Sequence, residues 1–232
     1  MALRRRSLST MQARPKRLIR FAAASVAGLL FLGGCGAGSK KSATTTSSTA
    51  VAAPESLPLS ERVIRQGELP GFVPRRPVLV RSVAKWVGPA TTLTRAEAAA
   101  WTARLRRDGF RLALRENLAP GTGSDRAALS WVVEFRSAIA AKSQVGTSVR
   151  LARILNEKPG YSYEAFKVNA IPGARGLHDT HPGGAGDNIL FSDGRFLYLV
   201  GDGWAAAAKS PPTRTHLLAA SMRLYRRVHA RG

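Results

Sequence analysis

A hairpin signal near the C-terminal end of the chain limits the fold more than any other feature of the sequence. Two apolar runs in NILFSDGRFLYLV are joined by Asp193-Gly194, a strong short-range pattern for two antiparallel strands. Leu129 to Arg136 is rich in β-branched and aromatic residues, YEAFKV at 163–168 alternates, and Val78 to Val87 adds a further expected strand. The sequence therefore predicts an antiparallel sheet.

Three segments with helical spacing of apolar residues predict helices. Thr94-Arg95-Ala96-Glu97 matches a capping box, in which the Thr hydroxyl and the Glu carboxylate each bind a free amide of the first turn. Asp108-Gly109 supplies a stop, because Gly adopts positive φ readily. We expect a second helix from Ser137 to Leu155 and a third from about Thr213 to Val228. The order of elements predicts one α+β domain over 58–232, an antiparallel sheet packed by about three helices.

The N-terminus has the pattern of an export signal. Residues 1–20 carry seven basic and no acidic side chains, and an uncharged run follows from Phe21 to Gly34. That run is shorter than the roughly 20 residues that cross a ~30 Å bilayer core, but it fits a signal peptide. Leu32-Gly33-Gly34-Cys35 resembles the bacterial lipobox, in which the cysteine is diacylated and becomes the first mature residue. An uncleaved anchor and a buried, inert Cys35 are the alternatives.

Lipidation would also account for the single cysteine of the chain. With Cys35 as its only cysteine, an exported domain forms no internal disulfide and depends on its core for stability. Residues 35–57 are rich in Ser, Thr, Ala and Gly and poor in large apolar side chains, which predicts a flexible tether. We therefore expect a signal peptide at 1–34, an acylated tether at 35–57, and a domain held by diacylglyceryl-Cys35 at the outer face of the cytoplasmic membrane.

The chain is strongly basic, with a formal net charge of +22. Removing residues 1–34 would leave +15. Such a charge favours anionic lipid headgroups, phosphate-rich wall polymers or nucleic acid, although an Arg- and Ala-rich composition is equally typical of a GC-rich genome. Export, scattered arginines and the lack of a recognisable binding motif argue against nucleic acid.

Several motifs together resemble a known group of proteins. These are LPGF at 69–72, the DGF that closes the first helix, WVVEF followed by an Ala-rich helix, NAIPGARG, and DNILFSDGRFLYLVG. They resemble actinobacterial lipoproteins and sensor-type extracellular domains with a Mog1/PsbP-like α+β fold, as in the LpqN and LpqT lipoprotein group. The resemblance covers about three quarters of the mature chain and has no catalytic signature. It implies a single-domain binding or accessory module at the cell surface.

The most unusual local chemistry lies in GLHDTHPGGAGDN, from Gly176 to Asn188. Its Gly and Pro content predicts a solvated loop, and binding residues concentrate on such loops. It holds His178, Asp179, His181 and Asp187. Imidazoles and carboxylates can together bind zinc, but no matching His or Cys pair occurs at a fixed spacing elsewhere. We therefore expect a candidate ligand loop without a metal or another cofactor.

The aromatic residues divide into two groups. Trp86, Trp101 and Trp131 fit strand or helix periodicity and are predicted to lie in the core. Trp204 follows GDG, and we expect it to cap an exposed end of the sheet or to line a ligand opening. The sequence contains neither the G-x-S-x-G elbow of hydrolases nor the H-E-x-x-H of metalloproteases, so no catalytic residue is assigned.

These observations predict a membrane-anchored lipoprotein that binds without catalysis. A helix layer on a sheet can open a pocket between the layers, which favours an apolar, amphiphilic or anionic envelope molecule as the ligand. A protein partner is a second hypothesis. The alternative from another class is a metal-dependent or hydrolytic envelope enzyme that uses the segment His178–His181.

Overall fold

The computed structural model describes residues 57–88, 93–121, 125–206 and 214–230. The predicted signal peptide, the lipobox Leu32-Gly33-Gly34, Cys35 and positions 35–56 of the tether lie outside the described residues. In chain order the elements are η2 (Leu59–Glu61), β1 (Phe72–Pro74), β2 (Val78–Val80), α1 (Val83–Val87), α2 (Arg95–Arg107), β3 (Phe110–Pro120), β4 (Arg126–Phe135), α3 (Ala138–Asn156), β5 (Ser162–Lys167), β6 (Arg175–His181), β7 (Gly184–Asp193), β8 (Phe196–Ala205) and α4 (Arg214–His229).

The strands form one antiparallel sheet within the described residues. Their order is β1-β3-β4-β8-β7-β6-β5, and β2 pairs with β3 beside β1. The predicted hairpin is confirmed, because Asp193 at the end of β7 pairs with Phe196 at the start of β8. Gly194 in its turn has a φ of +52°, a conformation that glycine adopts at little cost. The central pair β4 and β8 brings together strands separated by α3 and three further strands.

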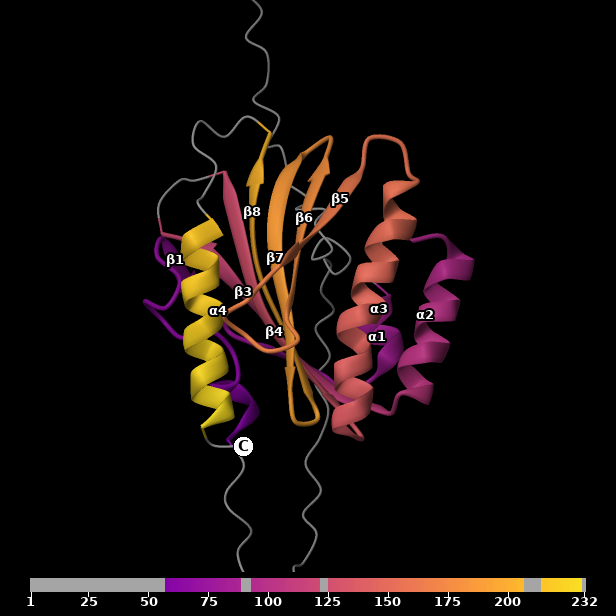
Figure 1. Ribbon diagram of the computed structural model, residues 1–232, viewed down its shortest axis with the longest axis horizontal. Coiled ribbons are helices and arrows are strands. Elements are labelled where there is room, and N and C mark those ends of the chain that lie inside the picture. The colour runs from indigo at the N-terminus through magenta and orange to yellow at the C-terminus, as the bar shows by residue number, and fades with distance from the viewer. Residues whose placement is uncertain (1–56, 89–92, 122–124, 207–213, 231–232) are drawn as a thin grey trace, which may run out of the picture.

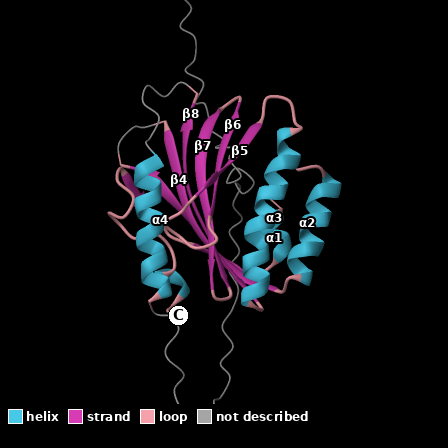
Figure 2. Cartoon of the chain, viewed as in Figure 1, coloured by secondary structure: helices cyan, strands magenta, loops and turns pink. Residues whose placement is uncertain are grey.

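Helices cover both faces of the sheet. Figures 1 and 2 show α1, α2 and α3 on one face and α4 on the other. Each face has its own apolar core, one under α1 to α3 and one under α4 and the chain that precedes β1. Because both faces of the sheet are covered, β4 and β8 are buried along most of their length. Continuous apolar runs are typical of strands buried on both faces. The predicted α+β domain is confirmed, with its helices divided between the two faces.

Local capping fixes where the helices begin. The capping box is present: the Glu97 amide donates to the Thr94 hydroxyl at 3.2 Å, and the Thr94 amide donates to the Glu97 carboxylate at 2.6 Å. The predicted strand over 78–87 is wrong in its second half. β2 ends at Val80, and Ser82 caps α1 by accepting a hydrogen bond from the Lys85 amide at 3.2 Å. A serine cap followed by one apolar turn resembles strand alternation when it is read over so short a span.

Arginine side chains hold the N-terminal strap, residues 57–71, against the α4 face of the sheet. Arg62 is buried, and its guanidinium donates to the Tyr198 hydroxyl at 2.7 Å. From α4, Arg227 donates to two strap carbonyl oxygens at 2.6 and 3.1 Å, and Arg223 donates to a third. Hydrogen bonds from a charged donor are the stronger kind. The strap is therefore part of the domain and closes the second core.

One carboxylate under this strap has been buried without a matching cation. Glu116 on β3 lies opposite Ser130, whose hydroxyl accepts a hydrogen bond from the Ile64 amide of the strap at 2.9 Å. Only 5% of Glu116 is exposed, and its Oε2 has no hydrogen-bond partner among the described residues. Burial raises the pKa of Glu116 from 4.5 to about 7, because the charged form loses its hydration.

Replacing Glu116 by Gln should therefore change how stability depends on pH. Between pH 4.5 and 7 the folded protein keeps a proton that the unfolded chain has released, so wild-type stability falls as the pH rises through that window. We expect Glu116→Gln to be more stable than wild type at pH 8 by about 1–2 kcal/mol, and close to it at pH 4. Urea unfolding at both pH values measures this, with exposed Glu164→Gln as the control. If the stability difference between Glu116→Gln and wild type were the same at pH 4 and pH 8, the prediction would be contradicted.

Candidate ligand-binding site

The segment Gly176 to Asn188 is not a loop. Its first part belongs to β6 and its last part to β7, and only Pro182 and Gly183 connect the two strands. The loop prediction is therefore wrong, because the glycines serve strand packing. A Cβ atom on Gly184 would lie 2.0 Å from the Trp204 carbonyl oxygen. Glycine inside a strand often marks such a close approach.

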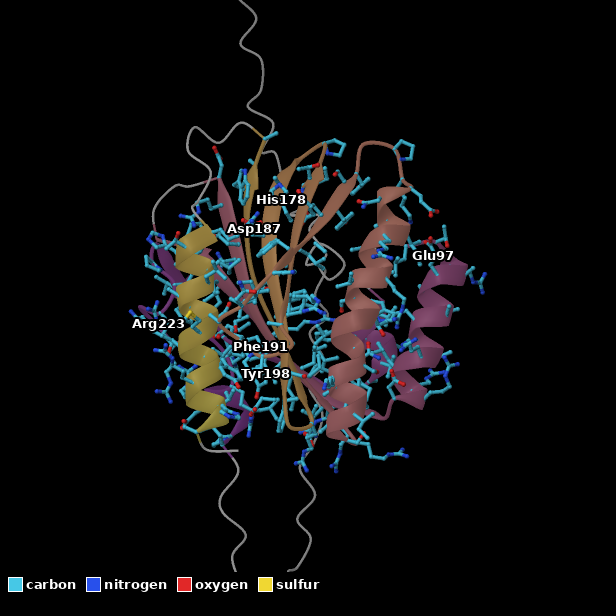
Figure 3. All side chains as sticks on the ribbon, viewed as in Figure 1. Glu97, His178, Asp187, Phe191, Tyr198 and Arg223 are labelled. Carbon is cyan, nitrogen blue, oxygen red and sulfur yellow. The ribbon has the colours of Figure 1, made fainter. Side chains whose placement is uncertain are left out.

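The strand structure separates the residues that the sequence grouped together. Side chains alternate across a strand, so His178 and Asp187 share one face of the sheet while Asp179 and His181 point to the other. His178 Nδ1 lies 3.0 Å from Asp187 Oδ1, and Figure 3 shows these two side chains together near one end of the sheet. The His178 ring centroid lies 6.1 Å from that of Trp204. Trp204 thus packs beside this pair at the end of β8.

Two carboxylates near the His178 end of the α4 face, Asp187 and Asp202, already have cationic partners. Asp187 accepts hydrogen bonds from Arg214 of α4 at 3.1 and 3.3 Å. Asp202 lies directly opposite Asp187 on β8 and accepts a hydrogen bond from Arg126 at 2.5 Å. Burial raises the pKa of Asp202 to about 6 even so, because its desolvation outweighs the nearby guanidinium. These pairs join α4 and the start of β4 to the middle of the sheet.

The other two predicted residues have partners of their own. Asp179 is fully buried, and its Oδ1 accepts a hydrogen bond from the side-chain Nδ2 of Asn188 at 3.0 Å. His181 stacks on Tyr161 with ring centroids 6.3 Å apart, and burial lowers its pKa. Within the part of the chain that the structure describes, no group of three or more His, Cys, Asp and Glu side chains could hold a metal ion. The five predicted residues thus form no single site.

An apolar cavity lies instead between the sheet and the helices of the opposite face. Its volume is about 50 Å³, and three tryptophans line it, Trp86 of α1, Trp101 of α2 and Trp131 of β4. Leu105 and Phe135 also line the wall, and Gln144 and Ser148 of α3 are its polar members. Sequence reasoning expected a pocket between the helices and the sheet, but it placed the tryptophans in the core and did not assign them to the pocket wall. The sequence feature that could have indicated the site is the presence of three large aromatic residues on segments far apart in the chain.

Helix α2 is the weakly held wall of this cavity. Leu105 is its one buried residue, and Trp101 is partly exposed. Polar contacts hold its two ends: Nζ of Lys158, just beyond α3, lies 3.0 Å from Glu97 Oε2, and Gln144 of α3 donates a hydrogen bond to Asp108. Glu97 is labelled in Figure 3, on the side of α2 nearer α3. A helix with so little buried apolar surface costs little to displace.

Comparison with known proteins shows the fold. No family model and no curated protein matches the sequence. The crystal structure of the extracellular domain of PknH from Mycobacterium tuberculosis superposes with a TM-score of 0.51 at 13% identity, covering 77% of this chain and 100% of that chain. An uncharacterized protein from Mycobacterium smegmatis, the Rv0999 ortholog, gives a TM-score of 0.38 at 14% identity, covering 68% of this chain and 90% of that chain. The α+β architecture therefore resembles that of an extracellular domain. No helix among the described residues is long and apolar enough to span a bilayer.

Proposed function

We propose that this chain is an extracytoplasmic binding module that holds an apolar or amphiphilic envelope molecule in the cavity between its sheet and helices α1 to α3. The observation that carries the proposal is the cavity itself, because three tryptophans and further apolar side chains enclose it with few polar groups. Ligand sites are typically concave and apolar, with a small number of polar contacts. The module binds without catalysis.

The location is part of the proposal. A basic N-terminus, a short apolar run and Leu32-Gly33-Gly34-Cys35 support cleavage and diacylation at Cys35, as in the lipoproteins that the sequence resembles. The likeness of the fold to the extracellular domain of PknH supports the same side of the membrane. The lipid anchor holds the domain at the outer face of the cytoplasmic membrane, and residues 36–56 give it reach.

Mass spectrometry of the protein extracted from its own membranes tests both parts. The denatured mass should begin at an acylated Cys35, and the native mass should be heavier by one discrete small molecule. Ser148→Leu adds a branched apolar side chain to the cavity wall. It should reduce the bound fraction at least ~tenfold, because the free energy lost by the steric clash with the ligand exceeds the free energy gained from the added apolar contact. Lys142→Leu, at an exposed position of the same helix, should retain the ligand.

Each outcome separates the parts of the proposal. A denatured mass that retains residues 1–34 would overturn the lipid anchor. A native mass equal to the denatured mass would overturn the small-molecule ligand, and a co-purified protein at one equivalent would replace it with a protein partner. Equal ligand occupancy in Ser148→Leu and wild type would move the site away from the cavity.

The alternative enzyme using His178 to His181 has less support. His178 and Asp187 lie on one face of the sheet and Asp179 on the other, in contact with Asn188. Groups that act on one substrate must converge on one reacting centre. The hairpin keeps these side chains on both sides of a covered sheet.

A further inference from the structure

One arginine lies between two of the cavity tryptophans. Arg115 on β3 is the cross-strand partner of Trp131 on β4. Its guanidinium carbon lies 4.5 Å from the Trp86 ring centroid and 5.8 Å from that of Trp131. A guanidinium over an aromatic face is attracted by the ring quadrupole, most of all where water is excluded. This contact places a positive charge against two of the tryptophans that line the apolar cavity.

The hydrogen bonds of Arg115 satisfy only part of its donor set. Its Nη2 donates to the Trp86 and Lys85 carbonyl oxygens at 2.5 and 3.2 Å. Its Nε is shielded from solvent and has no hydrogen-bond partner among the described residues, which also offer it no carboxylate within ion-pair distance. Burial lowers its pKa to about 10, as expected for a cation without a nearby anion.

Trp131, the cross-strand partner of Arg115, also has an unpaired hydrogen-bond donor within the described residues. Trp131 is 2% exposed and lines the cavity, and its Nε1 donor has no hydrogen-bond partner within the described ranges. Buried donors are nearly always paired, because an unpaired one loses its hydration without compensation. Arg115 and Trp131 are cross-strand partners, so two donors unpaired in the described part of the chain, one of them charged, belong to directly opposed residues, and the second of these residues lines the apolar cavity.

We infer that Arg115 and Trp131 bind the anionic headgroup of a single-chain amphiphile, a carboxylate or a phosphate, whose hydrocarbon chain enters the cavity beside them. The inference rests on the proposed function and names its ligand class. An anionic oxygen accepts from both Nε of Arg115 and Nε1 of Trp131, and the charge of the headgroup compensates the guanidinium. The tryptophan rings and Leu105 then contact the chain.

The small volume of the cavity limits how much of the hydrocarbon chain it can hold. A volume of about 50 Å³ accommodates roughly the space of one or two water molecules, so only the part of the chain nearest the headgroup fits. Longer chains require α2 to move outward. The helix buries only Leu105 fully and is held by polar contacts at its ends. When it moves outward, the small apolar contact between α2 and the sheet is replaced by a larger apolar contact with the hydrocarbon chain of the ligand.

Calorimetric titration of the full chain with three probes tests the inference. The probes are decanoate, 1-decanol with the same chain length and no charge, and inorganic phosphate. We expect decanoate to bind ~tenfold or more tightly than decanol, and phosphate alone to bind weakly or not at all, because a charge-assisted hydrogen bond contributes ten- to hundredfold in affinity. Arg115→Gln and Trp131→Phe should each weaken decanoate ~tenfold. Arg115→Gln should leave decanol unchanged, and Trp131→Phe should weaken decanol less than decanoate, because it shortens a ring of the cavity wall as well as removing the donor.

The variants are chosen so that a folding defect is visible. Trp131→Phe keeps an aromatic ring and removes only the N–H donor with part of the indole, and near-UV circular dichroism checks the packing. Arg107→Gln removes the same charge from an exposed position of α2 and should bind decanoate as wild type does. Unchanged decanoate affinity in both Arg115→Gln and Trp131→Phe would overturn the inference.

The remaining outcomes distinguish this inference from the proposed function. Equal binding of decanoate and decanol overturns the headgroup site and leaves an apolar cavity site. Tight binding of phosphate alone, matching that of decanoate, overturns the role of the hydrocarbon chain. Binding of none of the probes overturns both the headgroup site and the proposed cavity function.

Discussion

Replacing Phe191 by Ala should lower the free energy of unfolding by about 3–5 kcal/mol, the range for a large aromatic side chain removed from a packed core. Phe191 on β7 is fully buried beneath α4. Its ring stacks on Tyr198 of β8 at a centroid distance of 4.8 Å and meets Tyr225 of α4 edge-on at 5.8 Å. Figure 3 shows Phe191 and Tyr198 close together. The substitution therefore removes an aromatic contact between the central sheet and α4 from the core that joins them.

Urea unfolding at neutral pH measures this loss. The control is Ile139→Ala at the first turn of α3, where 83% of the side chain is exposed, and its stability should stay within about 0.5 kcal/mol of wild type. A loss below about 1 kcal/mol for Phe191→Ala would show that the face under α4 is not packed as described.

Gly184→Ala should destabilise the protein by about 3 kcal/mol, at the upper end of the cost of overpacking a core. Its new methyl group would lie 2.0 Å from the Trp204 carbonyl oxygen and 3.0 Å from the Ala205 Cα atom. Both are backbone atoms of the neighbouring strand β8, so no side chain can rotate away. The end of β7 must separate from β8, which also disturbs the contact between His178 and Trp204.

Thermal and urea unfolding should be compared with those of Gly67→Ala. Gly67 has a φ of +82°, and a Cβ atom there would meet nothing within 4 Å, so this control carries only the conformational cost, about 1 kcal/mol. Gly184 also has a positive φ, +155°, so both variants carry a conformational cost and the larger loss at Gly184 reports the added steric clash. If both lose the same stability, the close approach of β7 and β8 at Gly184 is absent in solution.

Local patterns were the part of the fold that the sequence could predict. The capping box at Thr94 and Glu97 needs only atoms that are three residues apart, and both of its hydrogen bonds are present. The turn at Asp193-Gly194 is equally local, and the strands on either side pair as predicted. Such signals survive because their energy does not depend on what packs against them.

Arrangements that depend on distant partners were not predicted. The sequence placed helices on a sheet without dividing them between two faces. It also predicted a loop over the segment 176–188, because clustered Gly, Pro and Asp residues most often indicate a turn when no neighbouring strand is known. A Cβ on Gly176 would lie 2.0 Å from the Phe166 ring, and one on Gly201 would lie 2.4 Å from Asn188 Oδ1. These glycines make room for side chains of neighbouring strands, and only the assembled sheet shows which ones.

The candidate site follows the same division. His178, Asp179, His181 and Asp187 are close in sequence, but strand alternation places them on two faces. The cavity tryptophans come from three separate elements, and each looks like an ordinary core residue in its own segment. A site built between layers leaves no trace in any single stretch of sequence.

Helix α2 stands outside the hydrogen-bond ladder of the sheet, and this has a consequence for how such a protein diversifies. Substitutions at Trp101 or at the positions beside Leu105 change the outer wall of the cavity, whereas the pairing of β4 with β8 does not involve them. Substitutions on α2 can therefore reshape the cavity without a penalty in strand pairing. The architecture separates the outer wall of the cavity from the hydrogen bonds that hold the sheet together.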